Sequence, residues 1–116
     1  MGGVKTGSLY GTLELLILKG LELRGPMHGV GVADHIARRS EGLFRIEEGS
    51  LYPALHRLQA KGHVTWEWMK TEEGKRAKYY ELTKAGRRAM KKDLGSWVAN
   101  TRAILSLLDL GAEDVR

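Results

Sequence analysis

The sequence predicts a mainly α-helical α+β domain that ends in one long amphipathic helix. Three observations lead to this fold class. Apolar residues recur at helical spacing over the first 60 residues, the spacing changes to strict alternation after residue 63, and a heptad-like apolar repeat occupies the last third. The chain has 116 residues, which is the size of one compact domain. We therefore expect one domain from which the last helix protrudes.

The composition excludes several classes of protein. Hydrophobic residues make up 42% and charged residues 28% of the chain, as in ordinary folded proteins. There is no Cys, which excludes a disulfide scaffold, a Cys-ligated metal site and thiol catalysis. No apolar stretch is long enough to span a bilayer and no signal peptide is evident, so we expect a cytoplasmic protein.

The net charge of +5 is concentrated in one segment. Residues 61–92 carry ten basic and four acidic side chains, whereas the rest of the chain is nearly balanced. Clustered positive charge favours a surface that follows nucleic-acid phosphates. The alternative is a solvated helix face next to a basic loop.

Two helices are expected in the first 40 residues. The first begins near Ser8, is largely buried, and stops at Gly25 and Pro26, because Pro disfavours helical geometry in the residue before it. After a tight turn, a second helix of about three turns runs from roughly His28 to Ser40.

A third helix carries most of the polar candidates. Ser50 is expected to be its N-cap, Pro53 lies in its first turn, and Gly62 ends it. The leucines of residues 51–58 fall on one face, which leaves the opposite face to polar side chains.

A β-hairpin with a basic tip follows. Alternation predicts strands at 63–69 and 77–82, joined by the polar segment 70–76. Trp66 and Trp68 share a strand face with Val64. We expect both to pack in the core or within the hairpin rather than to stack on a ligand.

The last helix, 84–110, is capped by Thr83 and would be on the order of 40 Å long. Its apolar stripe is longer than a domain of this size covers with its own surface, so it predicts a homodimer interface. The stripe consists of Met90, Leu94, Trp97, Thr101, Ile104 and Leu108.

This order of elements is that of a winged helix-turn-helix, with the hairpin as the wing. The expected organisation is a flexible N-terminal arm at 1–8, a winged helix-turn-helix DNA-binding domain at 9–83, a dimerisation helix at 84–110 and a flexible tail at 111–116. A helix that enters the major groove needs polar residues outward, and a wing needs cations that reach phosphates.

Four segments resemble the signature blocks of the PadR-type transcriptional regulators, in order and spacing. They are GTLELLIL at 11–18, GPMHG at 25–29, GSLYPALHRL at 49–58 and AKYYELTKAGR at 77–87. The likeness covers roughly residues 9–110, and a single C-terminal helix is similar to the family's smaller subgroup. One departure is Val30, where relatives often have Tyr.

The resemblance implies a dimeric transcriptional repressor in the cytoplasm that binds double-stranded DNA at an inverted repeat. It also implies a flat hydrophobic effector that stacks on Trp97, a residue that is otherwise expected in the dimer core. The residues that match the family's recognition helix and basic wing are Ser50, Tyr52, Pro53, His56, Arg57, Lys75, Arg76 and Lys78.

Within this set, the chemistry differs from residue to residue. Arg57 and His56 are expected to contact DNA, at bases or at phosphates, because Arg pairs with guanine and His can donate to N7. Tyr52 is expected either to donate to a phosphate or to pack in the core. Lys75, Arg76 and Lys78 are expected to contact phosphates.

No enzyme, cofactor or metal site is expected. The chain offers four His, no phosphate loop after a strand and no pair of carboxylates in an identifiable cleft.

The alternative function is a winged-helix protein-interaction module without specific DNA binding, in which Trp66, Trp68 and the last helix bind a partner protein. The confinement of the positive charge to the wing and the following helix favours DNA.

Overall fold

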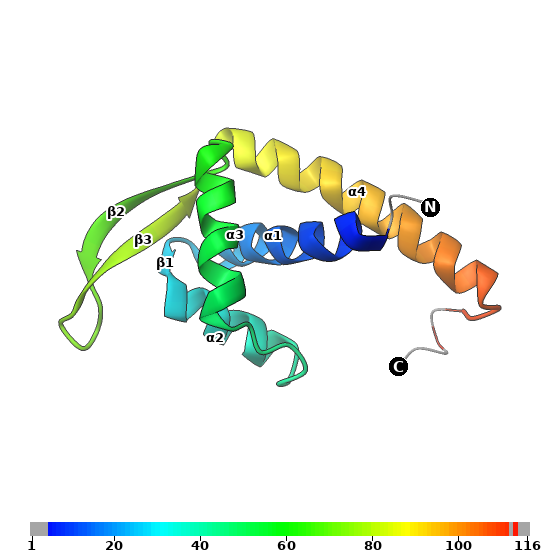
Figure 1. Cartoon of the computed structure of the whole chain (residues 1–116), viewed down its shortest axis with the longest axis horizontal. Coiled ribbons are helices and arrows are strands. Elements are labelled where there is room, and N and C mark those ends of the chain that lie inside the picture. The colour runs from blue at the N-terminus through cyan, green and yellow to red at the C-terminus, as the bar shows by residue number, and fades with distance from the viewer. Residues whose placement is uncertain (1–4, 112, 114–116) are drawn as a thin grey trace.

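A computed structural model of the chain describes residues 5–111 and 113 as helices around a small antiparallel sheet (Figure 1). The predicted α+β winged helix-turn-helix is confirmed. No helix in this described part combines the length and the apolar character that crossing a membrane requires. In chain order the elements are α1 (Lys5–Arg24), β1 (Met27–His28), α2 (Gly29–Arg39), α3 (Glu48–Ala60), β2 (Val64–Lys70), β3 (Arg76–Leu82) and α4 (Lys84–Leu107).

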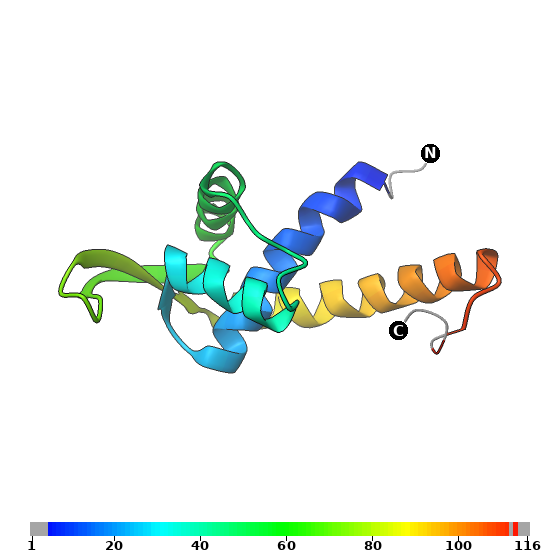
Figure 2. The ribbon, with the colours of Figure 1, turned by 90° about the horizontal axis from the view of Figure 1, so that it is seen from below.

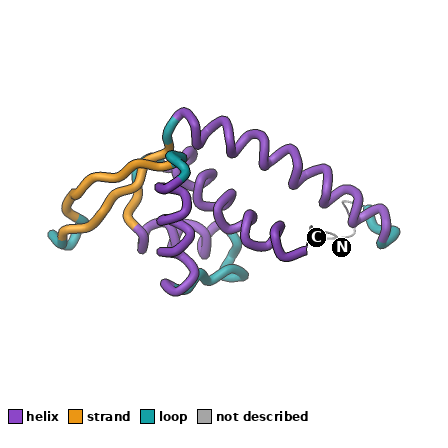
Figure 3. Tube along the Cα trace, turned by 45° about the horizontal axis from the view of Figure 1, so that its top comes forward, coloured by secondary structure: helices purple, strands orange, loops and turns teal. Residues whose placement is uncertain are grey.

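The core forms around α1, which contacts α2, α3, α4 and β3. Ile17, Leu18 and Leu21 of α1 are buried among side chains of all these elements. Figure 3 shows the helices gathered around one end of the sheet, while the far end of the β2–β3 hairpin extends beyond them. From α3, the core receives Leu51, Ala54, Leu55 and Leu58.

Two predicted helix ends are confirmed, and they lie against each other. Gly62 has φ +77° and follows α3, whose end is closed by bonds from the Gly62 N–H to the Gln59 carbonyl and from the His63 N–H to the Leu58 carbonyl. Thr83 caps α4: its side-chain oxygen accepts from the Gly86 N–H at 3.0 Å and its hydroxyl donates to the Gly62 carbonyl at 2.7 Å.

Two predicted helix starts are wrong. The arm expected at 1–8 is helical from Lys5, while residues 1–4 lie outside the described residues. Helix α3 begins at Glu48, so Ser50 lies within its first turn rather than at the N-cap, and Pro53 lies beyond that turn. In both cases apolar periodicity marks where a helix is buried, whereas backbone hydrogen bonding extends the helix further.

The sheet contains a strand that periodicity did not predict. Its order is β1-β3-β2, and the two-residue β1 pairs antiparallel with β3 through Met27 opposite Tyr80 and His28 opposite Tyr79. The His28 and Tyr79 rings lie 5.1 Å apart between centroids. Strand β1 therefore joins the turn between α1 and α2 to the base of the wing.

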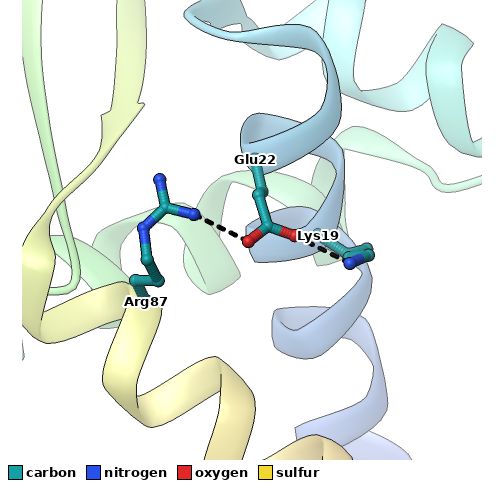
Figure 4. A network of polar contacts seen from close by, with 3 residues as sticks. All are labelled: Lys19, Glu22 and Arg87. Carbon is teal, nitrogen blue, oxygen red and sulfur yellow. Dashed lines mark hydrogen bonds and ion pairs between the residues drawn. The ribbon is translucent and has the colours of Figure 1, made fainter.

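Helix α4 packs on α1 only near its beginning and then diverges from it (Figure 2). Met90 is 2% exposed and lies in the domain's own core, so its assignment to the dimer interface is wrong. At the same end, Arg87 donates to Glu22 of α1 at 2.7 Å, and Glu22 also accepts from Lys19 (Figure 4).

Beyond Met90, α4 is largely exposed, and of the described residues at 91–110 only Val98, Thr101 and Leu105 are half-buried. No described side chain at 91–110 is buried, and the exposed apolar ones include Leu94, Trp97, Ile104 and Leu108. The helix ends at Leu107 rather than at 110, because Asp109 adopts a left-handed φ of 59° and closes the end. Of the predicted flexible tail at 111–116, only residues 111 and 113 are described.

Candidate nucleic-acid interface

A groove of about 540 Å³ lies between α3 and the wing. One wall is formed by Tyr52 and His56 of α3, and the other by Lys75, Arg76 and Lys78. The N-terminal end of α2 completes the groove. It therefore brings together five of the eight residues expected at a DNA interface, from two segments about twenty residues apart.

Close packing between α2 and α3 sets the position of Tyr52. A Cβ atom at position 29 would lie 2.6 Å from the Tyr52 hydroxyl oxygen, so only Gly29 allows this approach. Tyr80 of β3 also lines the groove. Burial raises the pKa of its phenol, and the nearby Tyr52 raises it further. Tyr80 is therefore a neutral group at pH 7. Val30 is exposed at the groove's edge.

Ser50, Pro53 and Arg57 lie on another side of α3. They line a second hollow, of about 480 Å³, together with Arg45, which precedes the helix. Since residues of a helix advance by about 100° each, Tyr52 and Arg57 project to opposite sides of the exposed face that holds Pro53 and His56. Sequence analysis missed Arg45, although a basic residue directly before a candidate recognition helix is a usable signal.

Arg57 is held by an acidic residue of α1. Its Nε–H donates to Glu14 at 2.8 Å, and Lys61 Nζ donates to the other oxygen of the same carboxylate at 2.8 Å. Partial burial of Glu14 opposes its ionisation, but the hydrogen bonds from Arg57 and Lys61 outweigh this effect and lower the pKa of Glu14. The two ion pairs connect the C-terminal end of α3 to α1, and the one that Arg57 forms holds its guanidinium on the side of α3 away from the wing.

A tight loop presents the cations of the wing. The Thr71 N–H donates to the Lys75 carbonyl at 2.7 Å, and the Lys75 N–H donates to the Thr71 hydroxyl at 3.1 Å. Gly74 takes a left-handed φ of 84° between them, which favours glycine. Within the described residues, Lys75, Arg76 and Lys78 form no ion pair, and Glu73 is the one acidic residue that lines the groove. The groove is therefore electropositive.

The three tryptophans occupy two separate places. Trp66 is half-buried and packs against the core, and Trp68 is 48% exposed on the same face of the wing, as predicted for packing within the hairpin. Trp97 is 42% exposed on α4 and lines neither of the two hollows beside α3. The expected effector slot at Trp97 stays a prediction.

The family assignment comes from a match over the middle of the chain. The sequence profile described as the transcriptional regulator PadR-like family matches residues 17–92. The chain belongs to this family. PadR-like proteins are transcriptional regulators rather than enzymes, and they bind DNA, so the chain is a DNA-binding transcriptional regulator.

Solved PadR-like structures share this fold over most of the chain. A PadR family transcriptional regulator from Eggerthella lenta is 30% identical, with a TM-score of 0.73 over 90% of this chain and 88% of that one. A PadR family transcription regulator from Clostridium difficile is 26% identical, with a TM-score of 0.70 over 84% and 99% of the two chains. The transcriptional regulator Rv3488 of Mycobacterium tuberculosis is 34% identical over 67 residues, which is 58% of this chain and 59% of that protein.

The ion pair between Glu14 and Arg57 predicts a stability contribution that depends on pH. Because the folded-state pKa of Glu14 is below its ordinary value of 4.5, the contribution is present above that pH and is lost as the pH falls through the folded pKa. Glu14→Gln should lower the free energy of unfolding by about 1 kcal/mol at pH 7. The difference from the wild type should be smaller at pH 3 than at pH 7, as measured by urea unfolding.

Glu72→Gln is the matched control, because Glu72 is exposed on the wing loop and forms no ion pair within the described residues. Its unfolding curve should follow the wild type at both pH values. An equal loss for Glu14→Gln at pH 3 and pH 7 would show that the carboxylate charge is not what stabilises the contact.

Proposed function

We propose that the chain is a homodimeric, sequence-specific repressor that binds an inverted-repeat operator with α3 in the major groove and the wing on the phosphate backbone. The observation that carries this proposal is the electropositive groove between α3 and the wing. It combines Tyr52 and His56 with three cations that form no ion pair among the described residues. A protein-interaction module has no use for this convergence of charge.

The proposed contacts divide into two kinds. His56 and Arg57 are the candidates for reading base edges, and Pro53 lies between them on the exposed face. Ser50, Tyr52 and the wing cations Lys75, Arg76 and Lys78 are proposed to contact phosphates. To read a base, the Arg57 guanidinium has to break its hydrogen bond to Glu14 and bind guanine, or bind Glu14 and guanine at the same time.

The apolar stripe of α4 supports the homodimer. Trp97, Ile104 and Leu108 are each more than 40% exposed, and no described side chain at 91–110 is buried. The same stripe of a second copy of the chain would bury these side chains in a symmetric dimer, which is the commonest form of oligomer. A slot between two Trp97 rings for a flat hydrophobic effector would exist only in this dimer.

The operator provides the central test. Footprinting on DNA upstream of the protein's own coding region should reveal an inverted repeat with half-sites centred about 10 or 20 base pairs apart. Arg57→Ala should cost about 1–3 kcal/mol per base contact on this operator and much less on random DNA at the same salt concentration. Equal losses on both DNAs would make Arg57 a phosphate contact, and retention on heparin without any footprint would contradict specific binding.

The wing predicts a change in salt dependence. Replacing Lys75 and Arg76 together by Ala removes about four phosphate contacts from a dimer. The slope of log affinity against log salt should therefore become shallower by roughly 3 to 4 units, on all DNA sequences alike. The control is Lys92→Ala with Arg102→Ala, which removes two exposed charges from α4 instead. If the wing variant keeps the wild-type slope, the wing does not touch the backbone.

The dimer is tested by placing a charge on the apolar stripe. Ile104→Glu should yield a monomer in analytical ultracentrifugation, because an unpaired carboxylate cannot be buried at the interface without a large desolvation cost. Ala99→Glu adds the same charge to the opposite face of α4, where Ala99 is exposed, and should stay dimeric. Monomers from both variants, or dimers from both, would contradict the assignment of this face.

A further inference from the structure

Two tryptophans and two cations share one face of the projecting hairpin. Lys78 Nζ lies 4.3 Å from the ring centroid of Trp66 and 5.8 Å from that of Trp68, and the Arg76 guanidinium carbon lies 4.7 Å from the Trp68 centroid. The Trp66 and Trp68 rings meet edge to face, with centroids 5.5 Å apart. The rings of β2 thus form a continuous aromatic surface beneath the cations of β3.

The strand register explains why each cation leans in the same direction. Trp68 is directly opposite Lys78, and Lys70 is directly opposite Arg76. Each cation lies over the tryptophan on its diagonal, one same-face position nearer the core. Long side chains reach diagonal neighbours in an antiparallel pair, so the contacts follow from the register. Both cations therefore lean back from the loop toward the core end of the hairpin.

Burial does not account for Trp68. Its side chain is 48% exposed, close to the 46% of Met69, which lies next to it on the opposite face of the strand. A tryptophan that served only the core would lose most of its exposure, as Tyr80 does on the neighbouring strand. The contacts of the exposed Trp68 ring are instead with Trp66 and the two cations.

We propose that Trp66 and Trp68 are positioning residues for DNA binding, which hold Lys78 and Arg76 over their rings in the orientation that phosphate oxygens require. The ring faces attract cations and restrict two long side chains before DNA arrives, so less conformational entropy is lost on binding. Unlike a carboxylate partner, a ring leaves the positive charge uncompensated. The inference rests on the proposed contact between the wing and the DNA backbone.

Double-mutant cycles test this inference in the full-length chain. Trp68→Leu should weaken binding to operator DNA about twofold to fivefold per wing, and Trp68→Phe, which keeps an aromatic face, should weaken it less. In the background of Arg76→Gln with Lys78→Gln, Trp68→Leu should cause no further loss, because its effect passes through these cations. Met69→Ala is the matched control from the opposite face and should leave affinity unchanged.

A second measurement uses the wild-type protein, so that it does not depend on the folding of a variant. In the NMR spectrum of the free protein, the methylene protons next to Lys78 Nζ should be shifted upfield by the ring of Trp66, relative to those of the exposed Lys92. An unshifted Lys78 signal would overturn the inference.

The binding data separate this inference from the proposed function. If neutralising Arg76 and Lys78 leaves DNA affinity unchanged, these two cations do not touch DNA, and both the positioning role and their part in the proposed wing contact fail. If neutralisation weakens binding but Trp68→Leu does not, only the positioning role fails. An equal loss from Trp68→Leu in both backgrounds, or equal losses for Leu and Phe, would also overturn it, since the ring would then act by packing or by touching DNA directly.

Discussion

The burial of one face of α3 is the constraint on which the interface depends. Leu51, Leu55 and Leu58 are each almost fully buried, and together they determine the rotation of the helix about its own axis. With that rotation set, His56 and Pro53 face outward, and Tyr52 and Arg57 project to the two sides. Replacing a polar residue on the outer face changes the chemistry of the surface, whereas changing a buried leucine would alter the direction of every outer side chain.

Acidic residues of α1 organise the cations that do not line the groove. Glu14 binds Arg57 and Lys61, and Glu22 binds Arg87, so two carboxylates attach α3 and α4 to the central helix. Two of the wing cations, Arg76 and Lys78, lie over aromatic rings instead and keep their charge. The same excess of basic residues therefore has a structural part around α1 and an uncompensated part in the wing.

Local patterns predicted most of the fold, because they report local causes. Apolar spacing located the helices and the hairpin, and Gly62 and Thr83 marked helix ends by their backbone and capping chemistry. The failures concern contacts between distant segments. Strand β1 has only two residues and exists because Tyr80 lies beside Met27, and Met90 continues the heptad pattern at a point where α1 still covers α4. The pattern also placed Arg57 on an accessible face, but the carboxylate that holds it lies 43 residues earlier.

The two-residue strand β1 has a consequence for the order in which the molecule opens. Its pairing with β3 closes a loop of about fifty residues with only two pairs of residues, whereas β2 and β3 are joined by a short loop and seven pairs. Loop-closure entropy opposes the first pairing more than the second. Small units with few contacts unfold locally at a free energy well below that of the whole domain. We therefore expect the two β1–β3 pairs to open before the β2–β3 hairpin does, which would change the width of the groove on its α2 side while the leucine core stays intact.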